Sequence, residues 1–437
     1  MDFLGPMRAT PLPALLFLAF LPMWPFVQRH HARLFFTTLS ILMIVIVAGP
    51  TLASGLLAII LLAYFPIEWA ARLTRGRRTA LLGGWLALHI AAYLCMFLPL
   101  PAVFRNERVL RPADAQWMFV MISGIGLTFM RLVSLLYDRV TGRAKRMSYA
   151  DYLCYMVYFP QFRCVPVERS RKFVPKLTRA RENWKPIDVL AGCARIALGI
   201  AALAALPKFA KLMPDIFGAL NPRSPANPFA HPELLSTGQI ILLVHAIPVA
   251  IYGLVSGAAS IQLGVSRTFG IRGSENTHFP FLASSPQTLW WRWNITVFAW
   301  LRDYAYAPLG GGKRHKYLNI LLVFVYCGLL HAIHWRGVVW GLWTGGVVAA
   351  YTWAEDRWQA RRRAQLQAHP SALKPGLEPP VAADSHPVRF LTALARLLGR
   401  LLTLEWATVG TVMLVDSEYC GARLLHEYGA RLAALFT

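Results

Sequence analysis

Apolar runs recur along almost the whole chain and are separated by short polar stretches. A transmembrane helix needs about 20 mostly apolar residues, and ten runs come near that length. They are residues 12–27, 34–50, 51–67, 79–100, 116–137, 187–206, 238–264, 317–333, 336–354 and 390–413. Gly49 and Pro50 separate the second run from the third, because proline ends helices. The pattern predicts an all-α, polytopic transmembrane helical bundle of about ten crossings.

Two further apolar stretches, 149–162 and 289–308, are too short or too polar to cross a membrane. We expect re-entrant or interfacial segments there, which are tolerated only where protein or water covers the backbone. Residues 364–388 are rich in Ala, Pro and polar side chains and predict a flexible cytoplasmic loop. Residues 418–437 predict an amphipathic surface helix with Arg423 and Arg431 on its polar face. We therefore expect residues 1–437 to form a single membrane-embedded domain.

Composition supports a membrane protein. Of the 437 residues, 56% are hydrophobic and only 15% charged, whereas a soluble domain carries nearer a quarter charged residues. The net charge of +24 comes from Lys and Arg in short loops between apolar runs, where they act as topology signals. This placement argues against nucleic acid as a partner. The six cysteines include no CxxC pair, which predicts neither a disulfide framework nor a zinc site. Since no A-x-A-like site follows it, we interpret Leu12–Val27 as a retained helix rather than a cleaved signal.

Charged and polar side chains gather in residues 289–346, around an apolar helix. An ionisable residue inside a membrane helix is costly, so it is by default a functional-site hypothesis. Four short motifs follow one another here: Trp291-Arg292-Trp293-Asn294, Leu301-Arg302-Asp303-Tyr304, Pro308-Leu309-Gly310-Gly311 and Leu330-His331-Ala332. Their order and spacing resemble the membrane-bound O-acyltransferase (MBOAT) family. Two positions depart from the bacterial members, Asn294 for His and Ala332 for Gly.

Three earlier segments carry the same resemblance, which covers a core of about residues 115–354. Gly124–Tyr137 looks like an early helix of the family, and Ser148–Glu168 looks like its Phe-Pro-Gln-Phe segment. Tyr252–Pro286 resembles a third segment but has Leu254 and Ser260 where that segment has aspartates. Within the family, the chain is most similar to the branch of bacterial polysaccharide and alginate O-acetyltransferases.

The resemblance implies a multi-pass protein of the bacterial inner membrane that transfers an acyl group, with acetyl as one candidate. The implied donor is a thioester, either acyl-CoA or an acyl-carrier protein, reached from the cytoplasm. The implied acceptor is a hydroxyl of an exported glycan or a lipid. We expect no permanently bound cofactor. We also expect no metal, since His331 and His334 stand three apart without further ligands nearby in sequence.

The chemistry suggests roles for these residues. Imidazole titrates near pH 6.5, and a water-poor tunnel favours its neutral form, so His331 is the expected general base for the acceptor hydroxyl. Asn294 cannot act as a base, but its side-chain amide can donate to the thioester carbonyl oxygen as charge develops there. Candidates for contact with the substrates are Trp291, Arg292, Trp293, Arg302, Asp303 and Tyr304.

Other interpretations stay open at this point. His331 and Asn294 can serve as helix-to-helix hydrogen-bonding groups. Arg292, Arg302 and Asp303 can form an ion pair that fixes the segment, and the tryptophans can act as interfacial anchors. For the whole protein, the alternatives are a transporter or flippase, which would predict inverted repeats, and a non-catalytic relative.

The loop charges generate a topological prediction. The basic excess should place loops 72–78, 139–146 and 355–389 in the cytoplasm, with both termini outside. Single cysteines introduced into these loops should resist a membrane-impermeant maleimide in intact cells and react in lysed cells. Labelling of loop 72–78 from outside intact cells would reverse the orientation.

Overall fold

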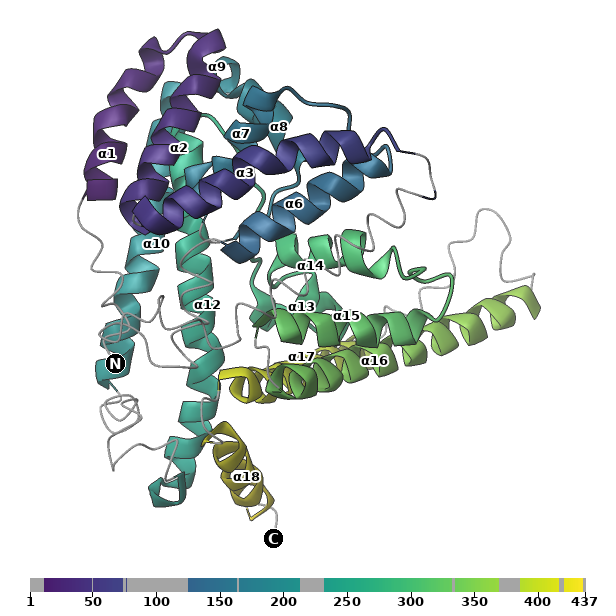
Figure 1. Ribbon diagram of the computed structural model, residues 1–437. Helices are drawn as coiled ribbons and strands as arrows, with labels where there is room; N and C mark the ends of the chain where they lie inside the picture. Colours follow the sequence, from purple (N-terminus) through teal and green to yellow (C-terminus); the bar gives the residue numbers. More distant parts are fainter. Residues whose placement is uncertain are drawn as a thin grey trace. The chain divides into compact units, whose positions relative to one another are not determined.

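The computed structural model describes residues 12–48, 50–73, 76, 125–162, 165–212, 232–331, 335–368, 386–415 and 420–434. All the regular elements in these ranges are helical (Figure 1), which confirms the all-α prediction. The predicted run 79–100 lies outside the described residues. The chain divides into two compact units, one of Met1–Leu235 with Val249–Asn276 and one of Ser236–Pro248 with Thr277–Thr437.

Most predicted runs of unit 1 coincide with helices. The elements of this unit are α1 (Leu12–Phe20), η2 (Leu21–Phe26), η3 (Arg29–His31), α2 (Ala32–Ala48), α3 (Pro50–Ala70), α6 (Ile125–Val140), α7 (Tyr149–Val157), η5 (Phe159–Gln161), α8 (Ser170–Thr178), α9 (Ala180–Asn183), α10 (Pro186–Leu212), η6 (Pro232–Leu234) and most of α12 (Thr237–Thr268). Aromatic rings fill the core: Trp24 packs on Phe36 and Phe269 with ring centroids 5.0 and 5.6 Å apart.

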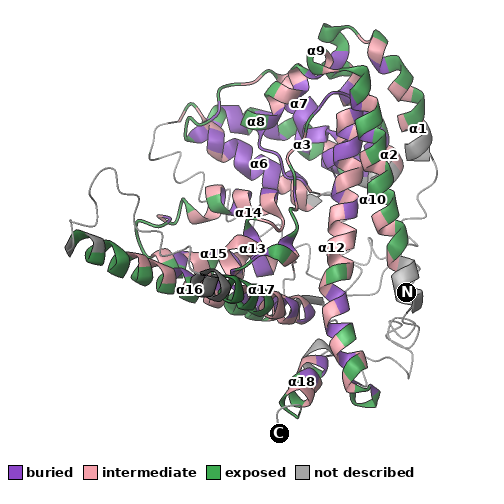
Figure 2. Cartoon of the chain, turned by 180° about the vertical axis from the view of Figure 1, so that it is seen from behind, coloured by how far each residue is buried: buried purple, intermediate pink, exposed green. Residues whose placement is uncertain are grey.

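The stretch 149–162 is built of short helices around a buried arginine. Helix α7 has nine residues, about 14 Å at 1.5 Å per residue, so it is shorter than the roughly 30 Å hydrocarbon core. Figure 2 shows it deep in unit 1. Arg131 of α6, only 1% exposed, donates to the main-chain carbonyls of Met156 (3.2 Å) and Gln161. These bonds give partners to both terminal nitrogens of the guanidinium and to carbonyls at the end of α7 and just after it.

Helices α10 and α12 approach each other closely at glycines. A Cβ on Gly264 would lie 2.7 Å from the carbonyl oxygen of Gly192, and one on Gly199 would lie 2.6 Å from that of Gly257. Small residues at such crossings let membrane helices pack backbone to backbone. Both helices, with Ala53–Ala70, are long and apolar enough to cross a membrane in the part of the chain that is described. The count of ten crossings stays a prediction.

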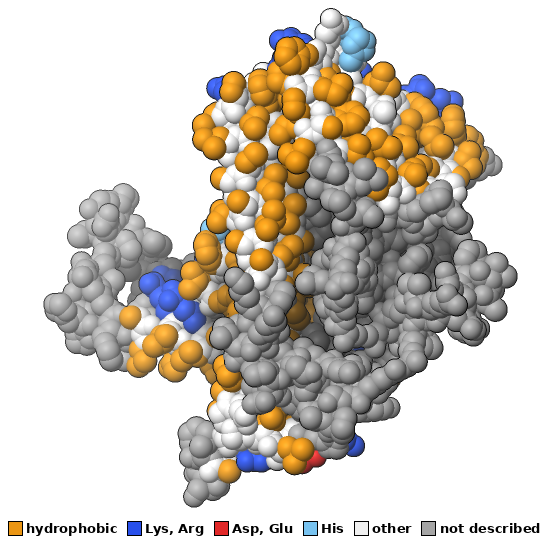
Figure 3. Space-filling view, turned by 90° about the vertical axis from the view of Figure 1, so that its left-hand side faces the viewer, with side chains coloured by type: hydrophobic (Ala, Val, Ile, Leu, Met, Phe, Trp, Pro, Cys, Tyr) orange, Lys and Arg blue, Asp and Glu red, His pale blue; other side chains and the backbone are white. Residues whose placement is uncertain are grey.

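The outer surface of α10 is apolar. Several of its large hydrophobic side chains are more than half exposed, namely Ile187, Leu190, Leu198 and Ile200. Figure 3 shows the corresponding side of the molecule, where hydrophobic side chains predominate. A soluble protein buries such a stripe, whereas a membrane protein turns it toward lipid.

Unit 2 holds the first turns of α12 and the elements after Asn276. They are η7 (Pro280–Leu282), α13 (Pro286–Trp290), α14 (Ile295–Leu301), the π-helical η8 (Arg302–Tyr306), α15 (Lys316–His331), α16 (Trp335–Ala368), α17 (His386–Val415) and α18 (Cys420–Ala433). The stretch 289–308 is thus composed of short helices, and its re-entrant or interfacial placement stays a prediction. Helix α16 continues to Ala368, so the predicted loop 364–388 starts later than expected, and residues 369–385 lie outside the described part.

Helices α15 and α16 form a tightly packed pair. A Cβ on Gly341 would lie 2.7 Å from the carbonyl oxygen of Phe324, so the two backbones nearly touch. At the other end, Lys316 Nζ lies 2.5 Å from Asp356 Oδ2, and the hydroxyl of Tyr317 donates to the same oxygen. The hydrogen bond from Lys316 holds the pKa of the Asp356 carboxyl below its usual range. The pair is therefore held at the middle of α15 and at its first residue.

The C-terminal helix α18 is held by a polar group as well as by its apolar face. Its Tyr428 hydroxyl donates to Glu405 Oε1 (2.6 Å), and His245 Nε2 lies 3.0 Å from Glu405 Oε2. Leu424 is fully buried, whereas Arg423 is exposed. This is the amphipathic pattern predicted for residues 418–437, although residues 418–419 and 435–437 lie outside the described part.

The glycine contacts generate a stability prediction. Gly264→Ala should lower the thermal stability of the purified protein, by about 1–3 kcal/mol, because its methyl group enters the space of α10. Gly55→Ala in α3 is the matched control, since no atom of the described residues lies within 4 Å of its Cβ position. There alanine should be neutral or stabilise by about 0.5–1 kcal/mol, because glycine is a poor helix former. Equal melting curves for both variants would contradict the close approach.

Candidate active site

The first predicted motif lies on a sharp turn between α13 and α14. Helix α13 begins with a capping box, in which Ser285 Oγ accepts from the Thr288 amide at 3.1 Å and Thr288 Oγ1 accepts from the Ser285 amide at 3.0 Å. The helix ends at Trp290, and the chain turns through Asn294, which has φ 45° and ψ 46°. Asparagine is one of the few non-glycine residues that tolerate this left-handed region. The turn therefore fixes the direction of α14.

The arginines of the predicted site have different partners. Arg292 Nη1 donates to the main-chain carbonyl of His278 (3.2 Å), which ties the turn to the preceding loop. Arg302 Nε lies 2.9 Å from Asp303 Oδ1, and its guanidinium lies 5.9 Å from the ring centre of Trp291. The predicted ion pair is thus present between Arg302 and Asp303, while Arg292 has another recorded partner.

The second and third motifs form an irregular segment that consists of a π-helical turn followed by a glycine turn. Residues Arg302–Tyr306 are π-helical, a geometry that occurs frequently at functional sites. Tyr304 is buried against Trp300, with ring centroids 5.5 Å apart. The glycine turn after it has φ of 100° at Gly310 and 57° at Gly311, which glycine adopts without steric cost.

Asn319, which the sequence did not single out, holds this glycine turn in place. Its side-chain amide, buried in α15, donates to the carbonyls of Leu309, Gly311 and Arg314 at 3.1, 3.0 and 2.6 Å. An asparagine in the first turn of an apolar helix is the signal in the sequence that could have found it.

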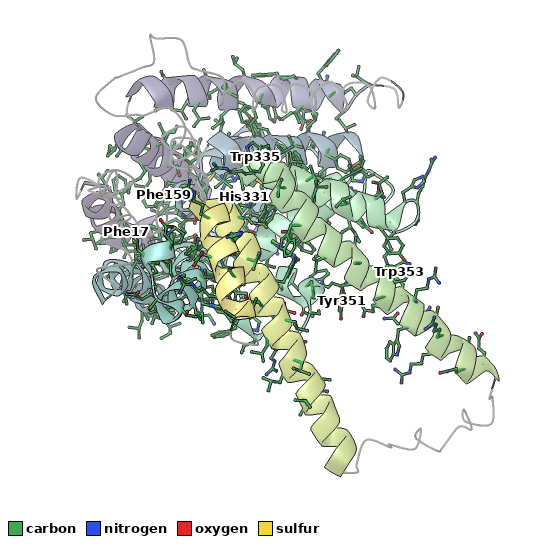
Figure 4. The ribbon with its side chains drawn as sticks, turned by 90° about the horizontal axis from the view of Figure 1, so that it is seen from below. Phe17, Phe159, His331, Trp335, Tyr351 and Trp353 are labelled. Carbon is green, nitrogen blue, oxygen red and sulfur yellow. The ribbon has the colours of Figure 1, made fainter. Side chains whose placement is uncertain are left out.

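His331 is the last residue of α15 in the described part of the chain and is half-buried (Figure 4). Its imidazole meets the ring of Trp340 edge to face, with centroids 5.6 Å apart and planes at 73°. Trp340 lies on α16 and is itself buried. Ala332 and His334 lie outside the described residues.

Trp290 links the segment of Asn294 with the partner of His331. Its ring stacks on Phe298 of α14 (6.4 Å, 22°) and stands perpendicular to Trp340 of α16 (6.1 Å, 87°). It also contacts Phe324 of α15 at 5.0 Å. Phe298 in turn donates its main-chain N–H to the carbonyl of Asn294 (2.8 Å). One row of aromatic rings therefore joins the first motif to the last.

These rings were not predicted, apart from the neighbouring Trp291 and Trp293. Trp290 and Phe298 lie in the same aromatic-rich stretch, but sequence alone does not show which ring faces α15. In the described residues, no group of three His, Cys, Asp or Glu side chains lies close enough to hold a metal ion.

Comparison with known proteins identifies the family. The model of the MBOAT (membrane-bound O-acyltransferase) family matches residues 51–364. This range is well over half of the chain and includes all four motifs. The chain belongs to the membrane-bound O-acyltransferase family. This confirms the resemblance found in the sequence, and the match begins before the expected core of 115–354. The apolar helices agree with it: the protein is an integral membrane protein.

Curated MBOAT relatives differ in the acceptor that their names give. The chain is 26% identical over 259 residues to "Probable alginate O-acetylase AlgI" of Azotobacter vinelandii, covering 58% of this chain and 46% of the relative. It is 25% identical over 201 residues to "Peptidoglycan O-acetyltransferase" of Helicobacter pylori, covering 45% and 36%. It is 25% identical over 337 residues to "Teichoic acid D-alanyltransferase" of Streptococcus thermophilus, covering 73% and 76%. The chain thus spans less than half the length of the alginate relatives that it matches.

The aromatic row generates a distance prediction for this MBOAT chain. Cysteines placed at Asn294 and His331, in a variant without the native cysteines, should be joined by a bismaleimide of about 10–15 Å reach. Groups that serve one reacting centre must lie that close. A pair at Asn294 and Trp358 is the control, because Trp358 lies 23 positions after the start of α16, about 34 Å along the helix. Cross-linking of the control but not of the first pair would exclude a joint role.

Proposed function

We propose that this protein transfers an acyl group from a thioester donor to a hydroxyl group of an exported glycan or a lipid. The family match carries the reaction class. The names of the relatives give acetyl and D-alanyl as transferred groups and alginate, peptidoglycan and teichoic acid as acceptors. Two of these names specify O-acetylation of a glycan, which favours acetyl transfer to a glycan hydroxyl. The bacterial inner membrane is the place where such a transfer meets an exported chain.

His331 is the proposed general base. The acceptor hydroxyl gives its proton to the imidazole while its oxygen forms a bond to the thioester carbonyl carbon. The carbonyl π electrons move to the oxygen, which becomes an oxyanion. When this intermediate collapses, the C–S bond breaks, and the departing thiolate takes the proton back from His331. The products are an ester and a free thiol, so no proton is gained or lost.

Several features of the site support this assignment. His331 lies at the end of an apolar helix against the buried Trp340, and the ring contact limits the orientations of the imidazole. The turn at Asn294 is rigid, and its amide is the proposed donor to the oxyanion. Trp291, Trp293, Arg302, Asp303 and Tyr304 are proposed to line the donor path. The bond from Arg292 to His278 favours a structural role for that arginine.

The assignment of the base is tested by substitution. His331→Ala removes the proton acceptor and leaves a good helix former, so acyl transfer should fall by about 10²–10⁴-fold with normal protein levels in the membrane. His334→Ala should cost much less, because the motif Leu330-His331-Ala332 assigns the base to His331 and not to His334. Transfer from acetyl-coenzyme A to alginate oligosaccharides or peptidoglycan fragments, measured with protein in nanodiscs, gives the rates. A fully active His331→Ala protein would show that another group is the base, and a normal protein without any transfer would favour a transporter or a non-catalytic relative.

A further inference from the structure

Trp290 carries a buried hydrogen-bond donor that no recorded protein group satisfies. Its side chain is 9% exposed, and its indole nitrogen has no hydrogen-bond partner among the described residues. Its ring neighbours Phe298, Phe324 and Trp340 have no acceptor to offer, since tryptophan nitrogen only donates. Leaving such a donor unpaired costs about 1–3 kcal/mol. Buried unpaired polar groups are few in native proteins and call for an explanation, such as a catalytic role or a bound water.

The place of Trp290 distinguishes it from the other buried tryptophans with an unpartnered nitrogen, Trp24 and Trp406. Trp290 alone among these three packs between the segment that carries Asn294 and the ring that contacts His331. A substrate carbonyl that reaches both predicted catalytic residues therefore comes close to the indole. The unpartnered donor therefore belongs to the ring that links the Asn294 segment to the ring against His331.

We propose that Trp290 is a further catalytic residue, whose indole N–H donates to the acyl carbonyl oxygen of the thioester. This inference rests on the proposed function. As the acceptor oxygen bonds to the carbonyl carbon and His331 takes the hydroxyl proton, negative charge forms on that oxygen. The indole N–H and the Asn294 amide then form hydrogen bonds to the oxyanion. Both bonds weaken again when the C–S bond breaks and the carbonyl re-forms.

The surroundings of Trp290 suit this role. Three rings fix its plane, so the donor needs no reorganisation as charge develops, and a preorganised dipole in a dry site is worth more than the same dipole in water. The indole is neutral, and its burial therefore carries none of the cost of a buried charge. A tryptophan at this position supplies a donor inside the hydrophobic layer, where an arginine or lysine would be expensive.

The decisive experiment removes the N–H and keeps the ring. Benzothienylalanine, introduced at position 290 by amber suppression, replaces the indole N–H by sulfur with nearly the same shape. Loss of one oxyanion donor should reduce kcat for transfer from acetyl-coenzyme A to alginate oligosaccharides by about 10²-fold. KM should be nearly unchanged, because the bond strengthens in the transition state. The same replacement at Trp353, which is exposed on the distant part of α16 (Figure 4), is the matched control and should change neither constant.

A spectroscopic readout separates this role from a structural one. The ¹³C=O stretch of bound acetyl-coenzyme A should shift to lower frequency in the normal protein, and part of this shift should disappear with benzothienylalanine at 290. Unchanged kcat and an unchanged stretch would overturn the inference and leave the indole bonded to a buried water only. If His331→Ala is inactive while the position 290 variant is fully active, only the role of Trp290 fails. If His331→Ala is also active, the base is another group, and if the normal protein transfers no acyl group at all, the proposed function itself fails.

Discussion

The membrane interior offers no water to hydrogen-bond buried polar groups, and this constraint explains how the described helices are held. Each unsatisfied group there costs several kcal/mol. Buried charges outside the apolar runs are paired in the same way: at the ends of α3 and α6, Arg139 Nε and Nη2 donate to the Glu68 carboxylate at 2.8 and 2.6 Å. Within α6, Arg131 donates to main-chain carbonyls. In unit 2, the Glu405 carboxylate is likewise paired, with His245 Nε2 and with the hydroxyl of Tyr428. Several buried donors in the described residues lack a recorded partner, and the indole of Trp290 is the one among the three such tryptophans that lies beside the candidate site.

The region around His331 combines a rigid frame with irregular backbone. The frame is the glycine-packed pair of α15 and α16, closed at one end by Lys316 and Asp356. The irregular part is the left-handed turn at Asn294 and the π-helical segment after it, both of which place side chains where a regular helix would not. The aromatic row is the connection between the two. The proposed reaction brings the thioester carbonyl to this aromatic row, and a dry environment there would strengthen each hydrogen bond made to that carbonyl.

Much of this fold follows from the sequence, because hydrophobic length alone predicts a membrane helix. The run 187–206 lies within α10 and 317–333 coincides with α15 up to the last described residue. Helix α16 extends beyond the apolar run 336–354 to Ala368. Its last part is polar, so a search for hydrophobic length does not detect it. The close approach of Gly192 to Gly264 depends on which helix faces which, and no periodicity shows this. His331 and Asn294 were found through motif order. Trp290 was missed because its importance lies in contacts with α14, α15 and α16, which only the folded chain brings together.

The central claim is that the acceptor hydroxyl meets a thioester carbonyl beside His331 within this aromatic row. An experimental structure tests it most directly, with the protein bound to acetonyl-coenzyme A, a ketone that cannot transfer its acyl group, and to an alginate oligosaccharide. The account predicts a sugar hydroxyl within about 3 Å of the His331 imidazole and the ketone oxygen directed toward Asn294 and Trp290. A ketone bound elsewhere in the protein, or a sugar hydroxyl separated from His331 by a packed helix, would contradict it.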